Sequence, residues 1–329
     1  MQINSGFMKC IIFGGAGFIG SYLAKSLLLQ GGEVTVFDSL YTGKMENIAE
    51  CKSSPDFKFI KADMRNLDEV KKAVAGHDII YHLAANADIR GGMENTFLDF
   101  EYNAITAYNA LEAMRKSDVN KIVFTSSSAV YGESGVFPTP ESFGPLRPTS
   151  LYGASKLAAE GYISAFCEDF GMQSWIFRFV NIVGSTNNHG VIGDFIRKLR
   201  ADGKKLVILG NGRQRKSCLH ISDCLSGMAA GINAGREKTN IYNIGNHDYV
   251  NVDAIADEVC QAMGLQGVKY EYTGGERGWT GDMPFVFLDN KKLCATGWKH
   301  SLNSRQAVRK AAEEMLEAQA IDDKHKQHY

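Results

Sequence analysis

The chain has 329 residues and a formal net charge of -1, and 44% of its residues are hydrophobic. This length is enough for one large domain or two moderate ones, and the composition is typical of a soluble globular protein. Basic residues are balanced and dispersed, which argues against a nucleic-acid partner, and no apolar run reaches membrane-spanning length. The seven cysteines are scattered without a C-x-x-C pair, so we expect a cytoplasmic protein with neither disulfides nor a metal site.

The first predicted element is a short apolar strand, Cys10–Phe13, which leads directly into a glycine-rich turn. Three glycines have the spacing G-x-x-G-x-x-G, and residues 21–30 after them are predicted to be helical. A strand, a glycine turn and a helix in this order build a dinucleotide site, in which the pyrophosphate lies on the N–H groups of the helix N-terminus. The alternative is a glycine-rich turn that binds nothing. The cofactor-binding residues predicted here are Gly14, Gly17, Phe18, Ile19 and Gly20.

The second predicted strand, Val34–Phe37, ends in Asp38. An acidic residue about 20 positions beyond the glycines hydrogen-bonds the ribose hydroxyls and repels a 2′-phosphate. Asp38 therefore predicts that the cofactor is NAD rather than NADP.

Apolar runs and helical stretches alternate through the rest of the first half. Strands buried on both faces that alternate with helices form a parallel sheet, so we predict an α/β fold with a doubly wound (Rossmann) sheet and a smaller mixed α/β domain. The further strands predicted in this half are Phe57–Ile60, Ile79–His82, Ile122–Thr125 and Trp175–Phe179, and helices predicted between them include Leu67–Ala75, Thr96–Lys116 and Lys156–Phe170.

Segments that follow two of these strands supply further candidate cofactor contacts. The carboxylate of Asp63 is placed either to accept a hydrogen bond from an adenine amino group or to cap a helix. Small residues after His82 let a cofactor pass near the backbone, whereas His82 itself is predicted to be a packed core residue. The amide of Asn103 either holds water or backbone near the site or is exposed at the surface. The cofactor-binding residues predicted in this part are Asp63, Met64, Leu83, Ala84, Ala85 and Asn103.

The predicted chemistry comes from a strand that ends in hydroxyls and from a tyrosine–lysine pair. Residues 124–132 read FTSSSAVYG, and Tyr152 and Lys156 lie four positions apart in YGASK. On a helix such positions share one face, so the ammonium lies beside the phenol and lowers its pKa from about 10. A phenolate base, an ammonium and a serine hydroxyl near a nicotinamide are what the oxidation of an alcohol to a ketone needs.

Together, GGAGFIG, Asp38, HLAA, SSSAVYG and YGASK resemble the extended short-chain dehydrogenase/reductase family of nucleotide-sugar epimerases and dehydratases, from about residue 9 to 298. The resemblance is closest to UDP-glucose 4-epimerase-like members. It implies that Tyr152 is the acid/base, that Lys156 holds the nicotinamide ribose and tunes Tyr152, and that Ser127 contacts the sugar. These three are the predicted catalytic residues, and Tyr152 and Lys156 also contact NAD.

The family's branches differ just after this serine. Its 4,6-dehydratases carry an Asp-Glu pair there, and its decarboxylases keep the Glu, whereas this chain has Ser128 and Ala129. We therefore predict an NAD-dependent nucleotide-sugar 4-epimerase that acts on a UDP-hexose or UDP-N-acetylhexosamine. Two alternatives stay open: a dehydrogenase or dehydratase on the same scaffold, and a non-catalytic NAD-sensing protein.

The second half resembles the family's nucleotide-sugar-binding region. Lys216 stands where the family usually has a phosphate-binding arginine, so Arg213 or Arg215 is an alternative for that role. Arg277 is a candidate for a second phosphate arginine, and Asp282 matches the acid that binds ribose. The substrate-binding residues predicted from the resemblance are Ser127, Ser128, Asn181, Val191, Arg213, Lys216, Arg277 and Asp282.

The resemblance also implies the domain organisation and the assembly. Residues 1–180, with 218–245 returning to them, are predicted to form the NAD-binding domain, and 181–217 with 246–329 the nucleotide-sugar-binding domain. A homodimer is predicted through the helices Thr96–Lys116 and Lys156–Phe170, with a nucleotide-diphosphate sugar as the small-molecule partner.

Overall fold

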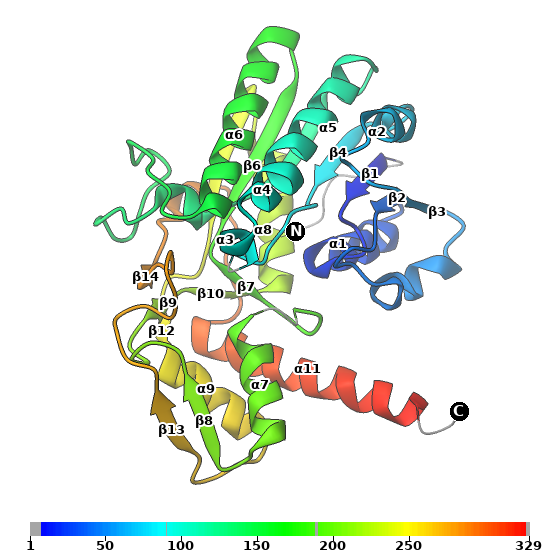
Figure 1. Cartoon of the computed structure of the whole chain (residues 1–329). Coiled ribbons are helices and arrows are strands. Elements are labelled where there is room, and N and C mark those ends of the chain that lie inside the picture. The colour runs from blue at the N-terminus through cyan, green and yellow to red at the C-terminus, as the bar shows by residue number, and fades with distance from the viewer. Residues whose placement is uncertain (1–7, 90, 188–189, 327–329) are drawn as a thin grey trace.

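The computed structural model describes residues 8–89, 91–187 and 190–326, and its centre is a seven-stranded sheet (Figure 1). All neighbouring strands are parallel, in the order β11-β6-β5-β4-β1-β2-β3. The predicted doubly wound α/β fold is therefore confirmed. The strands are β1 Lys9–Phe13, β2 Glu33–Asp38, β3 Phe57–Lys61, β4 Ile79–His82, β5 Lys121–Ser127, β6 Gln173–Phe179 and β11 Thr239–Ile244.

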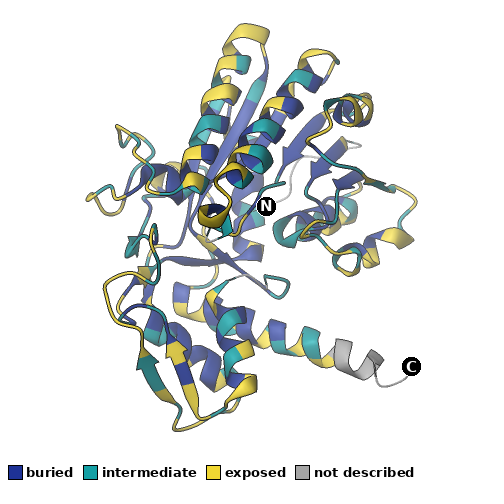
Figure 2. Cartoon of the chain, viewed as in Figure 1, coloured by how far each residue is buried: buried dark blue, intermediate teal, exposed yellow. Residues whose placement is uncertain are grey.

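Helices cover both faces of this sheet because its strands bury alternate residues on opposite sides. In β1, Cys10 and Ile12 belong to the core under α1 and α8, whereas Ile11 and Phe13 belong to the core under α2, α5 and α6. Figure 2 shows the buried strands between helices whose outer faces are exposed. The helices of these two layers are α1 Phe18–Leu29, α2 Leu67–Val74, α5 Thr106–Arg115, α6 Leu151–Phe170 and α8 Ile221–Ala234.

A third hydrophobic core lies among the remaining long helices and three small sheets. In these sheets β7 pairs with β10, β9 with both β12 and β14, and β8 with β13. The elements outside the large sheet are α7 Val191–Ala201, α9 Val252–Ala262, α10 Lys291–Cys294, α11 Ser304–Lys326, β7 Asn181–Val183, β8 Lys205–Ile208, β9 Arg215–Lys216, β10 Cys218–His220, β12 Val250–Asn251, β13 Lys269–Tyr272 and β14 Phe285–Val286. Of these, α10 and β14 contribute buried residues to the core under α1 and α8 instead. The proposed division into two domains stays a prediction.

Two predicted helices differ from the structure. Helix α6 begins at Leu151, five positions before the predicted start, because Ser150 caps it by accepting a hydrogen bond from the Gly153 N–H. The predicted helix 96–116 is divided into α4 Thr96–Asp99, a π-helical segment Phe100–Ile105 and α5, and it follows a short helix, α3 Gly91–Glu94. In the described part of the chain, no helix is long and apolar enough to cross a membrane.

A buried ion pair ties helix α6 to the sheet. The Arg178 guanidinium on β6 donates to both carboxylate oxygens of Glu160 on α6, the shorter contact being 2.6 Å. Ser126 at the end of β5 donates to the same carboxylate at 2.5 Å, and Arg178 also donates to the Tyr131 hydroxyl. Every charge in this cluster is paired, so removing one partner leaves the other buried without compensation.

We expect Glu160→Ala to lower the free energy of unfolding by about 3–5 kcal/mol, because it leaves a buried guanidinium unpaired. Glu168→Ala on the same helix is the matched control. Its partner, Lys238, is 2.6 Å away but both side chains are more than half exposed, so this variant should lose far less stability than Glu160→Ala. Urea unfolding of both variants measures the difference, and equal losses would contradict the assignment.

Candidate active site

The glycine turn between β1 and α1 fits closely against the backbone around it. Gly14 has a φ of +78°, and a Cβ there would lie 2.6 Å from the Ala84 nitrogen. A Cβ on Gly20 would collide with the Gly14 carbonyl oxygen. Helix α1 has no side-chain cap and no acidic residue in its first turn, so its N–H groups stay available for an anion.

Asp38 lies at the carboxyl end of β2, next to this turn. Its two carboxylate oxygens accept hydrogen bonds from the N–H groups of Ala16, at 2.9 Å, and Leu40, at 2.8 Å. The side chain is buried, and desolvation raises its pKa while the two hydrogen bonds oppose the shift. Because each oxygen can accept more than one hydrogen bond, the carboxylate retains capacity for ribose hydroxyls.

Asp63 does not cap helix α2, so that alternative is wrong. Asn66 is the cap, and its side chain accepts from the N–H groups of Asp68 and Glu69. The Asp63 carboxylate instead binds the Arg65 guanidinium at 2.6 Å, which lowers the pKa of Asp63. Contact of Asp63 and the buried Met64 with a cofactor stays a prediction.

The segment after β4 is fixed by Asn103, which is 1% exposed. The Asn103 side chain accepts from the Asn86 N–H at 2.8 Å and donates to the Ser155 hydroxyl at 2.9 Å. The surface alternative for Asn103 is therefore wrong, and it holds backbone beside the residues Leu83, Ala84 and Ala85. His82 is fully buried between the rings of Phe13 and Phe124, as expected for a core residue, and desolvation lowers its pKa to about 3.

The three predicted catalytic residues converge where β5 ends and α6 begins. The Lys156 ammonium is 2% exposed, donates to the Thr125 carbonyl at 2.9 Å and lies 5.9 Å from the centre of the Tyr152 ring. The Ser127 hydroxyl is hydrogen-bonded to Tyr152 and accepts from the Ala129 N–H at 3.1 Å. The neighbouring Ser128 is buried in the short 3-10 helix Ser128–Tyr131.

The expected lowering of the tyrosine pKa is wrong for the chain by itself. Desolvation raises the pKa of Tyr152 to about 12, outweighing the hydrogen bond with Ser127. Burial also lowers the pKa of Lys156 to about 7, opposed by Glu160 and Asp99. Lys156 is therefore only partly protonated near pH 7, and its charge lowers the pKa of the Tyr152 phenol correspondingly little.

Three predicted substrate residues are brought together beside β9. Lys216 donates to the Asp282 carboxylate at 2.7 Å, and Asp282 also accepts from the Gly278 N–H at 3.0 Å. Arg277 donates to the Asp282 carbonyl at 2.9 Å and forms a 2.6 Å ion pair with Glu133, which follows the Ser128–Tyr131 helix. The loop 276–283 is thereby tied to both β9 and the chain beyond β5.

The other predicted substrate residues lie apart from this cluster or at its edge. Asn181 begins β7 and donates to the Ser217 carbonyl, and Val191 is exposed at the start of α7. Arg213 and Arg215 line a separate groove of about 540 Å³, and the Arg215 guanidinium lies 3.7 Å from the centre of the Phe285 ring. Because Arg215 and Lys216 are successive residues of a strand, their side chains point to opposite faces. This placement favours Lys216 for the phosphate role.

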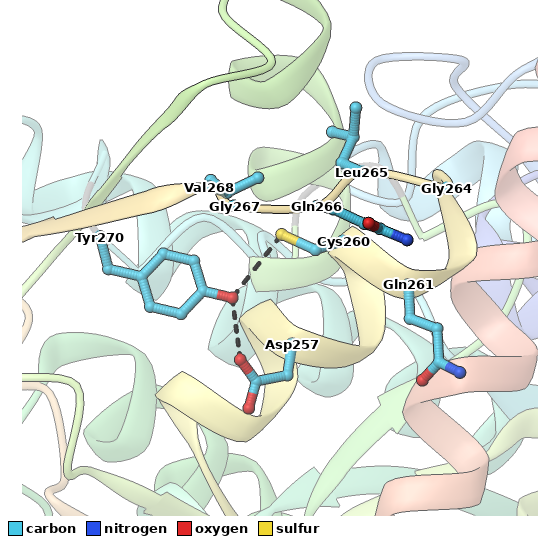
Figure 3. Close-up of a pocket in the computed structure, with 9 residues that line it drawn as sticks. All are labelled: Asp257, Cys260, Gln261, Gly264, Leu265, Gln266, Gly267, Val268 and Tyr270. Carbon is cyan, nitrogen blue, oxygen red and sulfur yellow. Dashed lines mark hydrogen bonds between the residues drawn. The ribbon is translucent and has the colours of Figure 1, made fainter.

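A pocket of about 430 Å³ between α9 and β13 contains none of the predicted site residues (Figure 3). Within it the Tyr270 hydroxyl donates to Asp257 at 2.9 Å. Among the described residues, no group of three or more His, Cys, Asp or Glu side chains is arranged to hold a metal ion.

Comparison with known proteins identifies the family. The model of the NAD dependent epimerase/dehydratase family matches residues 10–245. The chain belongs to this family. NAD is the family's cofactor, and the uncapped N-terminus of α1, the close-fitting glycine turn and Asp38 fit its pyrophosphate and ribose.

Relatives within the epimerase/dehydratase family carry several activities. A putative UDP-glucose 4-epimerase of Methanocaldococcus jannaschii is 32% identical over 306 residues, 91% of this chain and 96% of the relative. A crystal structure of a UDP-galactose 4-epimerase is 33% identical with a TM-score of 0.85, covering 94% of this chain and 99% of that chain. A UDP-N-acetyl-alpha-D-glucosaminuronate decarboxylase of Bacillus cytotoxicus is 31% identical, over 77% of this chain and 79% of the relative.

Sequence reasoning missed two groups of residues in this site. The ion pair of Glu160 with Arg178 joins elements 18 positions apart, and nothing local in the sequence pairs them. Asn86 and Asp99 form a buried hydrogen bond of 2.9 Å. Asp99 is an acid among the mostly apolar residues 96–100, a pattern that could have drawn attention to it, but only the tertiary structure shows that it is buried.

The depressed pKa of Lys156 predicts a pH-dependent stability. Its ammonium titrates near 7 in the fold and near 10.4 when unfolded, so the unfolded chain binds more protons between these values. Stability contributed by this group is therefore lowest below pH 7 and rises from about pH 7 to about pH 10.

Unfolding of the wild type and Lys156→Met across pH 6–10 measures this effect. We expect the stability of the wild type relative to the variant to rise with pH, and the exposed Lys52→Met control to show no such trend. A difference that is constant over this range would show that Lys156 does not titrate within it.

Proposed function

We propose that this enzyme is a nucleotide-sugar 4-epimerase that acts on a UDP-hexose or a UDP-N-acetylhexosamine. The observation that carries the proposal is that Ser127, Tyr152 and Lys156 lie close together. In addition, the two residues after Ser127 are Ser128 and Ala129 rather than an acid pair. Without a carboxylic acid at those positions, the short helix after β5 has no side chain to expel a C6 hydroxyl. The similarity to two UDP-hexose 4-epimerases supports the same activity.

The proton chemistry follows from the environment of Tyr152. The Tyr152 oxygen takes the proton of the sugar C4 hydroxyl, and Ser127 donates a hydrogen bond to the same sugar oxygen. NAD, when bound, supplies the hydride acceptor and a cationic ring. That positive charge and the Lys156 ammonium both favour the phenolate, opposing the desolvation that raises the pKa of Tyr152. Return of the same proton and hydride to the sugar leaves no net oxidation.

The diphosphate is proposed to bind at Lys216 and Arg277. Both cations are held by oxygen groups, Lys216 by Asp282 and Arg277 by Glu133 and the Asp282 carbonyl, so their positions are fixed before a substrate arrives. Binding energy at this anchor, remote from C4, holds the sugar while its keto form turns over within the site.

Tyr152→Phe should lower epimerisation of a UDP-sugar by about 100-fold or more, because the general base is lost. Proton NMR of UDP-glucose, UDP-galactose and their N-acetyl forms, incubated without added cofactor, identifies the inverted carbon. Tyr270→Phe, in the pocket of Figure 3, is the matched control and should retain full activity. Loss of water or accumulation of NADH would instead indicate a dehydratase or a dehydrogenase, and an active Tyr152→Phe enzyme would contradict the assignment.

We further propose a homodimer through α5 and α6, which lie side by side (Figure 1). Aromatic side chains are exposed on both helices: Tyr108 is 41% exposed, Tyr162 49% and Phe170 49%. The Tyr108 and Tyr162 rings are 6.0 Å apart and form one apolar surface.

Light scattering after gel filtration should give twice the 36.2 kDa chain mass for the wild type, and half that value for Tyr162→Glu, because a charge in an apolar interface is unfavourable. Tyr272→Glu, an equally exposed tyrosine on β13, should leave the dimer intact. A monomeric wild type would contradict this interface.

A further inference from the structure

A buried carboxylate that none of the predicted roles uses lies near the catalytic pair. Asp99, the last residue of α4, is 1% exposed. Its Oδ1 accepts a 2.9 Å hydrogen bond from the Asn86 side chain, whereas within the described ranges its Oδ2 is buried with no hydrogen-bond partner. Burying a charged oxygen without a donor is unfavourable, so its presence calls for a functional explanation.

Asp99 contacts the chain after β4 at two places, Asn86 and Gly92. At the first place it binds the Asn86 side chain, whose own backbone N–H donates to Asn103. At the second place Gly92 packs directly on the carboxylate, since a Cβ on Gly92 would collide with Oδ2. The Gly92 N–H also donates to the Asp88 carbonyl at 3.1 Å.

The same hydrogen bonds continue into the catalytic helix. Asn103 donates to the Ser155 hydroxyl at 2.9 Å, and Ser155 donates to the Tyr152 carbonyl at 2.8 Å. Asn103 belongs to the π-helical segment Phe100–Ile105, a distortion that occurs frequently at functional sites. An unbroken path therefore runs from Asp99 to the backbone of Tyr152.

The charge of Asp99 also acts on Lys156. Glu160, which is paired with Arg178, faces the ammonium from α6 and raises the pKa of Lys156 more than Asp99 does. His82 faces it from β4 and is neutral, and Thr125 presents a carbonyl from β5. Desolvation raises the pKa of Asp99, and the Asn86 hydrogen bond and the Lys156 ammonium oppose that shift; Asp99 forms no salt bridge with any cation of the described residues.

We propose that Asp99 is a positioning residue of the Tyr152–Lys156 pair. Its carboxylate holds Asn86 and packs on Gly92, and the hydrogen bonds from Asn86 through Asn103 to Ser155 carry this tie to the catalytic helix. The catalytic role of Tyr152 and Lys156 rests on the proposed function, whereas the contacts and the charge of Asp99 do not depend on it.

Two substitutions separate the geometry from the charge. In Asp99→Asn the amide oxygen can still accept from Asn86 while the charge is lost, and in Asn86→Ala the tie is lost while the charge remains. Glu94→Gln removes an exposed carboxylate on the adjacent α3 and is the matched control. All readouts use the full chain with NAD.

The first readout is the pH at which Lys156 titrates, taken from the stability of each protein relative to its Lys156→Met counterpart, and it needs no substrate. Asp99→Asn should move this titration to lower pH, because the negative charge of Asp99 favours the protonated form of Lys156. Asn86→Ala and Glu94→Gln should leave it in place. An unmoved titration in Asp99→Asn would overturn the electrostatic role.

The second readout is amide deuterium exchange of residues 86–89 and 91–92 together with kcat on the UDP-sugar. Asn86→Ala should accelerate exchange there and lower kcat about tenfold with an unchanged pH profile, whereas Asp99→Asn should move the profile to lower pH. Exchange as slow as in the wild type would overturn the positioning role, and this result stands even if Asp99→Asn does not fold. A wild type without epimerase activity would reject the proposed function while leaving the exchange and stability results interpretable.

Discussion

The burial of one lysine ammonium is the constraint on which the site depends. Lys156 can be inside the protein only because the Thr125 carbonyl at the end of β5 accepts its hydrogen bond and two acidic side chains face it. This requirement fixes the start of α6 against the end of β5, and Tyr152 and Ser127 are brought together as a result. Because burial lowers the pKa of Lys156 to about 7, a charge bound beside it would change how far the lysine is protonated.

Two different constraints shape the regions around β1 and β9: close backbone packing at the first, and paired charges at the second. Around β1 the close approach of the glycine turn to the Ala84 backbone leaves the N–H groups of α1 to bind an anion. Around β9 the positions of Lys216 and Arg277 are set by carboxylates that a diphosphate resembles in charge.

The parallel sheet was predictable because each strand is a short apolar run followed by a helical pattern, as in Cys10–Phe13 and Ile79–His82. The tyrosine–lysine pair was predictable because a four-residue spacing on a helix places both side chains on one face. The small sheets were not predictable from the sequence, because a strand such as β9 has only two residues and shows no hydrophobic periodicity.

The electrostatics were the least accessible part. From the sequence the lysine was expected to lower the tyrosine pKa, but the sign depends on how completely both groups are desolvated, which only the packing shows. The roles of Asp99 and Glu160 depend likewise on partners distant in the sequence.

The claim that one phenol and one cofactor carry out a closed cycle at C4 is tested most directly by isotope tracing. A UDP-hexose carrying deuterium at C4 is converted by the enzyme with its own NAD, and the product is analysed by mass spectrometry and NMR. The account predicts that the epimer retains deuterium at C4, because the hydride leaves and returns within one site. Loss of the label to water or to free NADH would contradict it.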